Sequence, residues 1–234
     1  MAEGQAVLDS VRAAAMLPGV GKIGPVVIAG QSQGGGAVLW ASQLAHSYAP
    51  ELDLRGVVAL APAAEFPLII QAAGSPPFDA SLGNLLIAVD GLHAGYGHSF
   101  DPTTFLTPAA LADLPRVSNE CVDATIRRWR GLPIRDLLAR NPLAVPALAS
   151  IIQQNSPGSR NPGVPIFLAQ GSADQQIPVG VSAQLAAQYC RLGANLTRRV
   201  YPGADHDGVV DAATTDVLTW MSQRDQGRPA PSDC

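Results

Sequence analysis

Residues 26–34 read Val-Val-Ile-Ala-Gly-Gln-Ser-Gln-Gly, and this stretch decides the fold. A short apolar, β-branched run leads into the pattern Gly-x-Ser-x-Gly, and a helical pattern follows it. That context predicts a nucleophile elbow, a sharp strand-to-helix turn that lifts the hydroxyl of Ser32 out of the backbone. We expect Gly30 and Gly34 to let strand and helix approach closely, and Ser32 to take a strained conformation. A helix that begins at Ser32 directs its unpaired N–H groups at any negative charge that forms there.

Strand-like and helix-like segments alternate on both sides of the elbow. Four short runs are predicted as strands, and they cover residues 25–30, 55–61, 164–169 and 196–201. The first three are almost wholly apolar, as in strands buried on both faces of a parallel sheet. The last carries Arg198 and Arg199, which favour the edge of a sheet. Four helices are predicted between and around the strands, at 3–17, 32–48, 178–192 and from 209 onward. The alternation predicts an α/β fold with a parallel sheet of about four strands.

The alternation breaks up between about residue 62 and residue 162. Nine prolines interrupt this stretch between residues 67 and 146, with short helical pieces predicted at 79–91, 108–114 and 117–130. Such a stretch is too long for a loop, so we expect a helical cap inserted into the α/β core. The predicted domains are a core of residues 1–64 and 163–223, a cap of residues 65–162, and a disordered tail of residues 224–234.

Composition narrows the class of function. The chain has 234 residues, a hydrophobic content of 47% and a net charge of −4. That acidic balance argues against a nucleic-acid partner, which would require a basic face. No apolar run reaches about 18 residues, so no membrane span is predicted. The first residues, Met-Ala-Glu-Gly-Gln, lack the basic and apolar regions of a signal peptide, so none is expected here.

The cysteines define no disulfide framework. The chain has three, at Cys121, Cys190 and Cys234, and an odd, small number leaves the pairing open. One bridge is compatible with this count, and Cys190–Cys234 is the pair to test. Free or buried thiols are the favoured interpretation.

Three residues with complementary chemistry each follow a predicted strand. They are Ser32, Asp174 and His206. A serine hydroxyl must lose its proton as it attacks, a histidine can accept that proton, and a buried carboxylate stabilises the resulting cation. Functional residues of parallel sheets gather at the carboxyl ends of strands, and the order Ser, Asp, His is that of α/β-hydrolases. The sequence therefore predicts Ser32 as nucleophile, Asp174 as acid and His206 as base.

Other acids compete with Asp174. Asp205 and Asp207 flank His206 and would have to fold back to reach it. Asp174 instead follows its own strand and precedes a helix that Pro178 starts, so it is preferred. Asp205 and Asp207 are expected to cap the last helix.

The remaining histidines have simpler interpretations. His46 lies near the end of the elbow helix and is expected at the surface. His93 and His98 lie in a glycine-rich part of the predicted cap, where their spacing is compatible with a metal pair. Because no third ligand is evident, no metal site and no cofactor are predicted.

Four motifs together resemble one known family. They are Gly-Gln-Ser-Gln-Gly-Gly-Gly at 30–36, Tyr-Ala-Pro-Glu-Leu at 48–52 followed by Arg-Gly-Val-Val, Gly-x-x-Asp-x-x-x-Pro at 171–178, and Tyr-Pro-Gly-Ala-Asp-His at 201–206. The set resembles the secretory lipases, α/β-hydrolases of fungi and actinobacteria. The resemblance implies a helical cap, hydrolysis of carboxylic esters, commonly acylglycerols, and a secreted or cell-envelope location for full-length members. By motif, Ser32, Asp174 and His206 correspond to the family's nucleophile, acid and base.

The resemblance covers the C-terminal part of the family's domain. A complete α/β-hydrolase has several strands before the elbow strand, whereas one helix precedes it here, so we expect an N-terminally incomplete fold. The strand at 26–29 is composed like a central strand, and at an open edge it would invite self-association. The backbone N–H of Gln33 is the predicted oxyanion donor, and its usual second donor comes from an early loop that this sequence does not contain. Losing one such donor typically costs about 10²–10³ in turnover.

The sequence therefore predicts a serine carboxylic-ester hydrolase that acts on a small-molecule ester or lipid. The same triad would also serve an acyltransferase or a peptidase. A third alternative is a truncated, weakly active or inactive remnant that binds lipid or a partner protein.

Overall fold

The computed structural model describes residues 1–73 and 82–234, and its chain divides into two compact units. Unit 1 comprises Met1–Glu65 and Ser156–Cys234, and unit 2 comprises Phe66–Asn155. The predicted insertion, 65–162, extends beyond unit 2. Residues after 155 belong to unit 1 because Ser159 Oγ and the Arg160 N–H both donate to Gln43 Oε1, at 3.2 and 3.0 Å.

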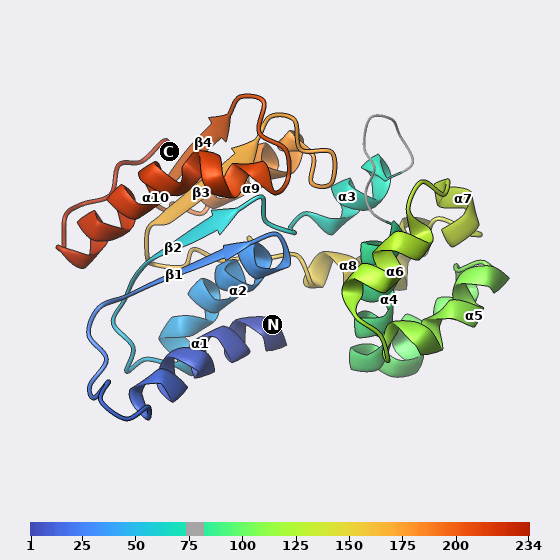
Figure 1. The fold of residues 1–234 in the computed structure, drawn as a ribbon, viewed down its shortest axis with the longest axis horizontal. Helices are drawn as coiled ribbons and strands as arrows, with labels where there is room; N and C mark the ends of the chain where they lie inside the picture. Colours follow the sequence, from blue (N-terminus) through green and yellow to red (C-terminus); the bar gives the residue numbers. More distant parts are fainter. Residues whose placement is uncertain (74–81) are drawn as a thin grey trace. The chain divides into compact units, whose positions relative to one another are not determined.

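The sheet of unit 1 is parallel throughout, with the order β1-β2-β3-β4 among the described strands. The strands are β1 (Val26–Gln31), β2 (Leu54–Leu60), β3 (Ile166–Gly171) and β4 (Leu196–Tyr201). Each lies within two residues of its predicted run. The predicted α/β fold with a parallel four-stranded sheet is therefore confirmed (Figure 1).

Helices cover both faces of this sheet. They are α1 (Ala2–Ala15), α2 (Gln33–Tyr48), α9 (Val179–Arg191) and α10 (Gly208–Asp225). Alternate residues of β2 face opposite ways: Val57 and Ala59 pack with side chains of α1, α2 and α9, whereas Val58 and Leu60 pack with α10. Figure 1 shows α2 and α10 on opposite sides of the sheet. Burial on both faces explains why β2 and β3 read as unbroken apolar runs.

The two edges of the described sheet differ in chemistry. The predicted edge strand, β4, is indeed at an edge, since it pairs only with β3 among the described strands. Its Arg198 folds over α9 and donates to Ser182 Oγ at 3.0 Å, and burial lowers the pKa of this guanidinium. At the other edge, β1 is apolar and pairs with β2 alone among the described strands.

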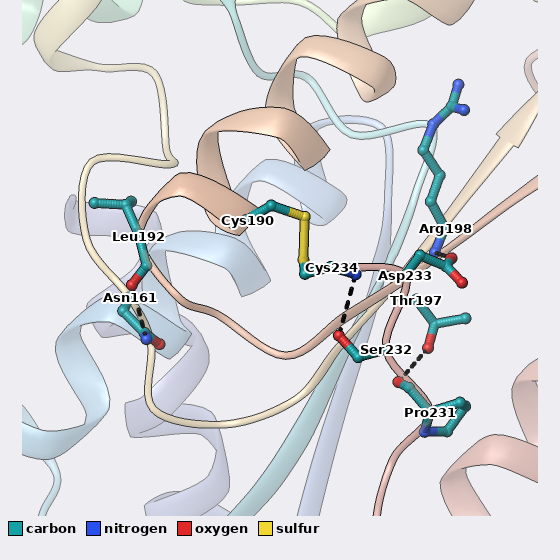
Figure 2. Close-up of a disulfide and its surroundings, with 9 residues drawn as sticks. All are labelled: Asn161, Cys190, Leu192, Thr197, Arg198, Pro231, Ser232, Asp233 and Cys234. Atoms are coloured by element: carbon teal, nitrogen blue, oxygen red, sulfur yellow. Dashed lines mark hydrogen bonds between the residues drawn. A yellow bond between two sulfur atoms is a disulfide. The ribbon is translucent and has the colours of Figure 1, made fainter.

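The C-terminal segment corrects two predictions. Residues 224–234 were expected to be disordered, and the thiols to be free. Instead Cys234 forms a disulfide with Cys190 of α9, with Cα atoms 5.2 Å apart (Figure 2). The backbone N–H of Asp233 donates to Leu196 O at 2.7 Å, and Thr197 Oγ1 donates to Pro231 O at 2.7 Å. The segment is ordered because one covalent bond and these hydrogen bonds fasten it beside β4. Cys121 is exposed and unpaired.

Unit 2 is helical. Its α-helices in the described residues are α3 (Phe66–Ala72), α4 (Leu82–Tyr96), α5 (Pro108–Val117), α6 (Val122–Trp129), α7 (Ile134–Leu137) and α8 (Pro146–Gln154), with short 3₁₀ turns between them. They enclose a core of their own, built around Leu86, Phe100, Phe105 and Leu137. Of the helix predicted at 79–91, residues 79–81 lie outside the described residues.

Three helices of unit 2 were not predicted: the four-residue α7, and the longer pair α3 and α8. Both begin at or beside a proline, with Pro67 the second residue of α3 and Pro146 the first of α8. Proline suits the first turn of a helix because its missing N–H is not needed there. In the sequence these prolines were interpreted only as breaks. Within the part of the chain that the structure describes, no helix has both the length and the apolarity needed to cross a membrane.

Candidate active site

Ser32 lies at the turn between β1 and α2, in the strained backbone conformation that the elbow motif predicts. Its φ is 55° and its ψ is −118°, an unfavourable region for a residue with a side chain. Two backbone hydrogen bonds to β2 and the residues just after it hold Ser32 there. The Ser32 N–H donates to Leu60 O at 2.9 Å, and Ser32 O accepts from the Ala63 N–H at 2.8 Å. The end of β2 therefore fixes the elbow from the side.

The glycines of the elbow are not equivalent, which corrects the expectation for Gly34. A Cβ on Gly30 would lie 2.2 Å from Gly34 O, so only glycine fits there. A Cβ on Gly34 would meet no described atom within 4 Å. The close contacts occur at the next two residues. A Cβ on Gly35 would lie 2.9 Å from Pro62 Cα, and a Cβ on Gly36 would lie 2.6 Å from Ala63 O. The tight contact therefore extends along the first turn of α2.

The structure brings Ser32, His206 and Asp174 together in one chain of hydrogen bonds. His206 Nε2 lies 2.9 Å from Ser32 Oγ, and His206 Nδ1 lies 2.8 Å from Asp174 Oδ2. Because a carboxylate only accepts, it selects the tautomer with a proton on Nδ1. Nε2 is then left as an acceptor for the serine proton. His206 and Asp174 are buried, at 6% and 4% exposed, while Ser32 is partly open to solvent.

Asp174 is held by hydrogen bonds to both carboxylate oxygens. Its Oδ1 accepts the backbone N–H groups of Gln176 and Ile177, at 2.9 and 2.8 Å. Its Oδ2 accepts Gln170 Nε2 at 2.8 Å as well as His206. The arrangement keeps an oriented negative charge next to the imidazole.

The loop that carries His206 is positioned by the strands beside it. A Cβ on Gly171, at the end of β3, would lie 2.3 Å from Ala204 O, so glycine lets the loop cross this strand end. The Ala173 N–H donates to Ala204 O at 2.9 Å. Gln31, the last residue of β1, donates from Nε2 to His206 O at 3.2 Å. Hydrogen bonds from Ala173 and Gln31 therefore hold the main chain of the loop that carries the imidazole.

The competing carboxylates do not reach His206 Nδ1, which is bonded to Asp174. Asp205 Oδ1 accepts the backbone N–H of Gly208 at 2.7 Å, as expected of a residue that caps α10. Asp207 occupies the N-cap position of α10 but makes no side-chain capping bond. Both are exposed. The geometry thus pairs His206 with Asp174.

The other histidines make no hydrogen bond to Ser32, His206 or Asp174 in the described part of the chain. His46 is exposed on α2, as expected. His93 Nδ1 lies 2.9 Å from Phe100 O, and His98 is exposed, both within unit 2. Among the described residues, no group of three or more His, Cys, Asp or Glu side chains is placed to hold a metal ion.

Gln33 is the first residue of α2. A backbone N–H at this position has no carbonyl of an earlier helical turn to bind, so it is open to an anion. The side chain of Gln33 is bonded elsewhere, since its Nε2 donates to Glu3 Oε1 on α1. That bond ties the elbow to the first helix.

No sequence pattern assigned a role to three residues that shape the site, namely Gln31, Gln170 and Gly171. Each is the last or the last but one residue of a strand. A signal was available for Gln170, because it is a polar residue that continues the apolar run at 164–169. A fully buried amide in such a place needs a specific partner.

The sequence of this chain is similar to those of known lipases. The sequence model of the secretory lipase family matches residues 1–233. A secreted triacylglycerol lipase of Malassezia globosa is 23% identical over 99% of this chain and 53% of its own. A Mycobacterium tuberculosis protein named a "probable inactive lipase" is 28% identical over 97% of this chain and 51% of its own.

Among solved structures, lipase A of Candida antarctica in its closed state superposes with a TM-score of 0.81 at 25% identity. The match covers 97% of this chain and 55% of that one. The chain thus spans about half the length of the relatives it matches.

Proposed function

The chain belongs to the secretory lipase family, and from that membership we propose that it is a serine hydrolase of carboxylic esters, acylglycerols among them. The observation that supports this most is the pair of hydrogen bonds on His206, one to Ser32 and one to Asp174. A histidine bonded on both sides in this way can take a proton from the hydroxyl while the carboxylate stabilises the cation.

The proposed reaction starts when Ser32 Oγ attacks the acyl carbonyl and its proton passes to His206 Nε2. Negative charge develops on the carbonyl oxygen, and the Gln33 N–H at the positive end of α2 donates to it. His206 then gives its proton to the departing alcohol, which leaves an ester between the acyl group and Ser32. Water, deprotonated by His206, attacks that ester, and His206 returns the proton to Ser32 Oγ as the acid leaves.

A second candidate has one observation in its favour. The relative from Mycobacterium tuberculosis is named a "probable inactive lipase", so the fold occurs in a protein for which activity is doubted. A remnant of this kind would bind a lipid or a partner without cleaving it. It would be expected to tolerate loss of the Ser32 hydroxyl, whereas the enzyme would not.

Hydrolysis of p-nitrophenyl butyrate separates the two candidates. The enzyme predicts that Ser32→Ala removes activity and that Asp174→Asn lowers kcat by about 10⁴, because the amide selects the wrong histidine tautomer. Asp205→Asn and Asp207→Asn are matched controls on either side of His206 and should retain most activity. A folded wild-type protein without Ser32-dependent hydrolysis would favour the remnant.

We also propose that the protein acts outside the cytosol. Five of its relatives are named secreted triacylglycerol lipases of Malassezia globosa. The Cys190–Cys234 disulfide supports this location, because such bonds persist mainly in oxidising compartments. Non-reducing mass spectrometry of protein purified from its own cells should find this bridge formed.

A further inference from the structure

Gln170 is a fully buried side chain that reaches the same oxygen as the catalytic base. It lies one residue before the end of β3 and is 0% exposed. Its Nε2 donates to Asp174 Oδ2 at 2.8 Å and to Ile177 O at 3.1 Å. His206 Nδ1 lies 2.8 Å from that same Oδ2. One carboxylate oxygen therefore serves both the imidazole and the glutamine.

The direction of the Gln170 amide is fixed by its partners. Turning the amide over would set Oε1 against a carboxylate oxygen and a carbonyl oxygen, and all three are acceptors. In the orientation observed, Oε1 is buried without a hydrogen-bond partner in the described part of the chain. A buried, unpaired acceptor is unfavourable for folding. A methionine of similar length would avoid that cost, so the contribution of Gln170 lies in its two N–H bonds.

Those two bonds bear on both position and charge. Together with the backbone donors on Oδ1, they leave the carboxylate plane of Asp174 one orientation, with Oδ2 toward His206. A donor on Oδ2 also stabilises the negative charge there and weakens the hold of the carboxylate on a protonated imidazole. Without Gln170, an imidazolium at His206 would be more stable, and the neutral base would form only at higher pH.

Other carboxyl groups of the described residues that follow β2 or β4, or lie in the first turn of α10, are bonded elsewhere or exposed. They are Glu65 after β2, Asp205 and Asp207 beside His206, and Asp211 in the first turn of α10. Glu65 is buried and accepts Gln184 Nε2 of α9 at 2.7 Å, and Asp205 accepts the Gly208 N–H. Asp207 and Asp211 are exposed, where water and salt screen their charge. Gln170 acts on Asp174 at hydrogen-bond distance, inside the protein.

We propose that Gln170 is a positioning residue of the ester-hydrolase reaction, which holds Asp174 Oδ2 against His206 and sets the lower pH limit at which His206 accepts the Ser32 proton. This inference rests on the proposed function. Gln170 acts on His206 through Asp174 and has no contact with substrate in this proposal.

The test is the pH dependence of kcat/KM for p-nitrophenyl butyrate, measured on the full chain. Gln170→Met keeps the length of the side chain and removes both N–H bonds. We expect the acid limb, the part of the profile in which activity falls at low pH, to move to higher pH by about half to one unit. Gln170→Leu removes both N–H bonds with a shorter apolar side chain, and it should move the limb in the same direction. Gln43→Met is the matched control, a buried glutamine on α2 that bonds Arg160 and Ser159. Its acid limb should stay at the wild-type position.

Acid limbs of both Gln170 variants that coincide with wild type would overturn the inference, whatever happens to stability or maximal rate. If Gln170→Met fails to fold, the Leu variant decides by the same criterion. The proposed function is judged separately by Ser32→Ala. Wild-type hydrolysis that depends on Ser32, combined with an unmoved limb, rejects the role of Gln170 alone, whereas hydrolysis independent of Ser32 rejects both.

Discussion

The two glycines of the Gly-x-Ser-x-Gly motif should respond oppositely to alanine. In Gly30→Ala, the new Cβ would start 2.2 Å from Gly34 O and 2.4 Å from Gly34 C, both backbone atoms. Cβ contacts closer than 3.0 Å are essentially never found, so 3.0 − 2.2 = 0.8 Å of backbone movement is needed at the least. That movement separates the end of β1 from the first turn of α2, and Ser32 lies between them.

The magnitudes follow from this displacement. Overpacking of this kind costs about 1–3 kcal/mol, and backbone obstacles lie at the upper end because they cannot rotate away. For a chain of this size that corresponds to a fall in Tm of roughly 2–12 °C. A shift of about 1 Å in a reacting group can lower turnover about 10²-fold, and kcat/KM of Gly30→Ala should fall by that order.

Gly34→Ala is the internal control because the added Cβ meets no described atom within 4 Å. Alanine is favoured over glycine inside a helix by about 1 kcal/mol, so its Tm should be unchanged or a few degrees higher. The measurement is thermal unfolding by circular dichroism, with ester hydrolysis on the same samples. Equal losses of stability in the two variants would refute the steric argument, since they would show that the motif requires both glycines.

Two further predictions concern regions away from the site. The Cys190–Cys234 bridge spans 44 residues, a loop for which the chain-entropy relation gives about 4 kcal/mol. The double variant Cys190→Ala/Cys234→Ala should therefore unfold at a Tm roughly 8–16 °C lower, and a reductant should lower the Tm of wild type only; an unchanged Tm would contradict the stabilising role. In unit 2, a hydrogen bond from Arg128, followed by one from Thr125, lowers the pKa of Glu120 below 4.5. A depressed pKa stabilises the folded state at pH values above the ordinary pKa of 4.5. That stabilisation is lost as the pH falls through 4.5 toward the folded-state pKa. Glu120→Gln should flatten that part of the acid unfolding curve, and an identical curve would argue against the pair.

Much of unit 1 could be predicted because its signals are local and strong. Strands buried on both faces must be apolar at every position, so β2 and β3 stand out from their surroundings. Arg198 could be placed at an edge because a central strand offers charged side chains no route to solvent. Asp174 was preferred because it follows a strand of its own, whereas Asp205 and Asp207 would have to fold back on His206, and the structure pairs Asp174 with His206.

What could not be predicted depends on contacts between distant residues. Residues 224–234 read as a tail because their polar sequence says nothing of the bond from Cys234 to Cys190. The requirement for glycine at position 36 and not at 34 depends on Ala63 O, which would lie 2.6 Å from a Cβ on Gly36. Gln170 follows the apolar run, and its role appears only when the loop to Asp174 closes on it.

The most direct test of the central claim is labelling of Ser32 by a fluorophosphonate, located by peptide mass spectrometry. If His206 activates Ser32 and Asp174 orients His206, the folded protein should carry the label on Ser32. The rate of labelling should fall by several powers of ten in His206→Ala and Asp174→Asn but not in Asp205→Asn. A folded wild-type protein with unlabelled Ser32, or one labelled equally fast in all of these variants, would contradict the account.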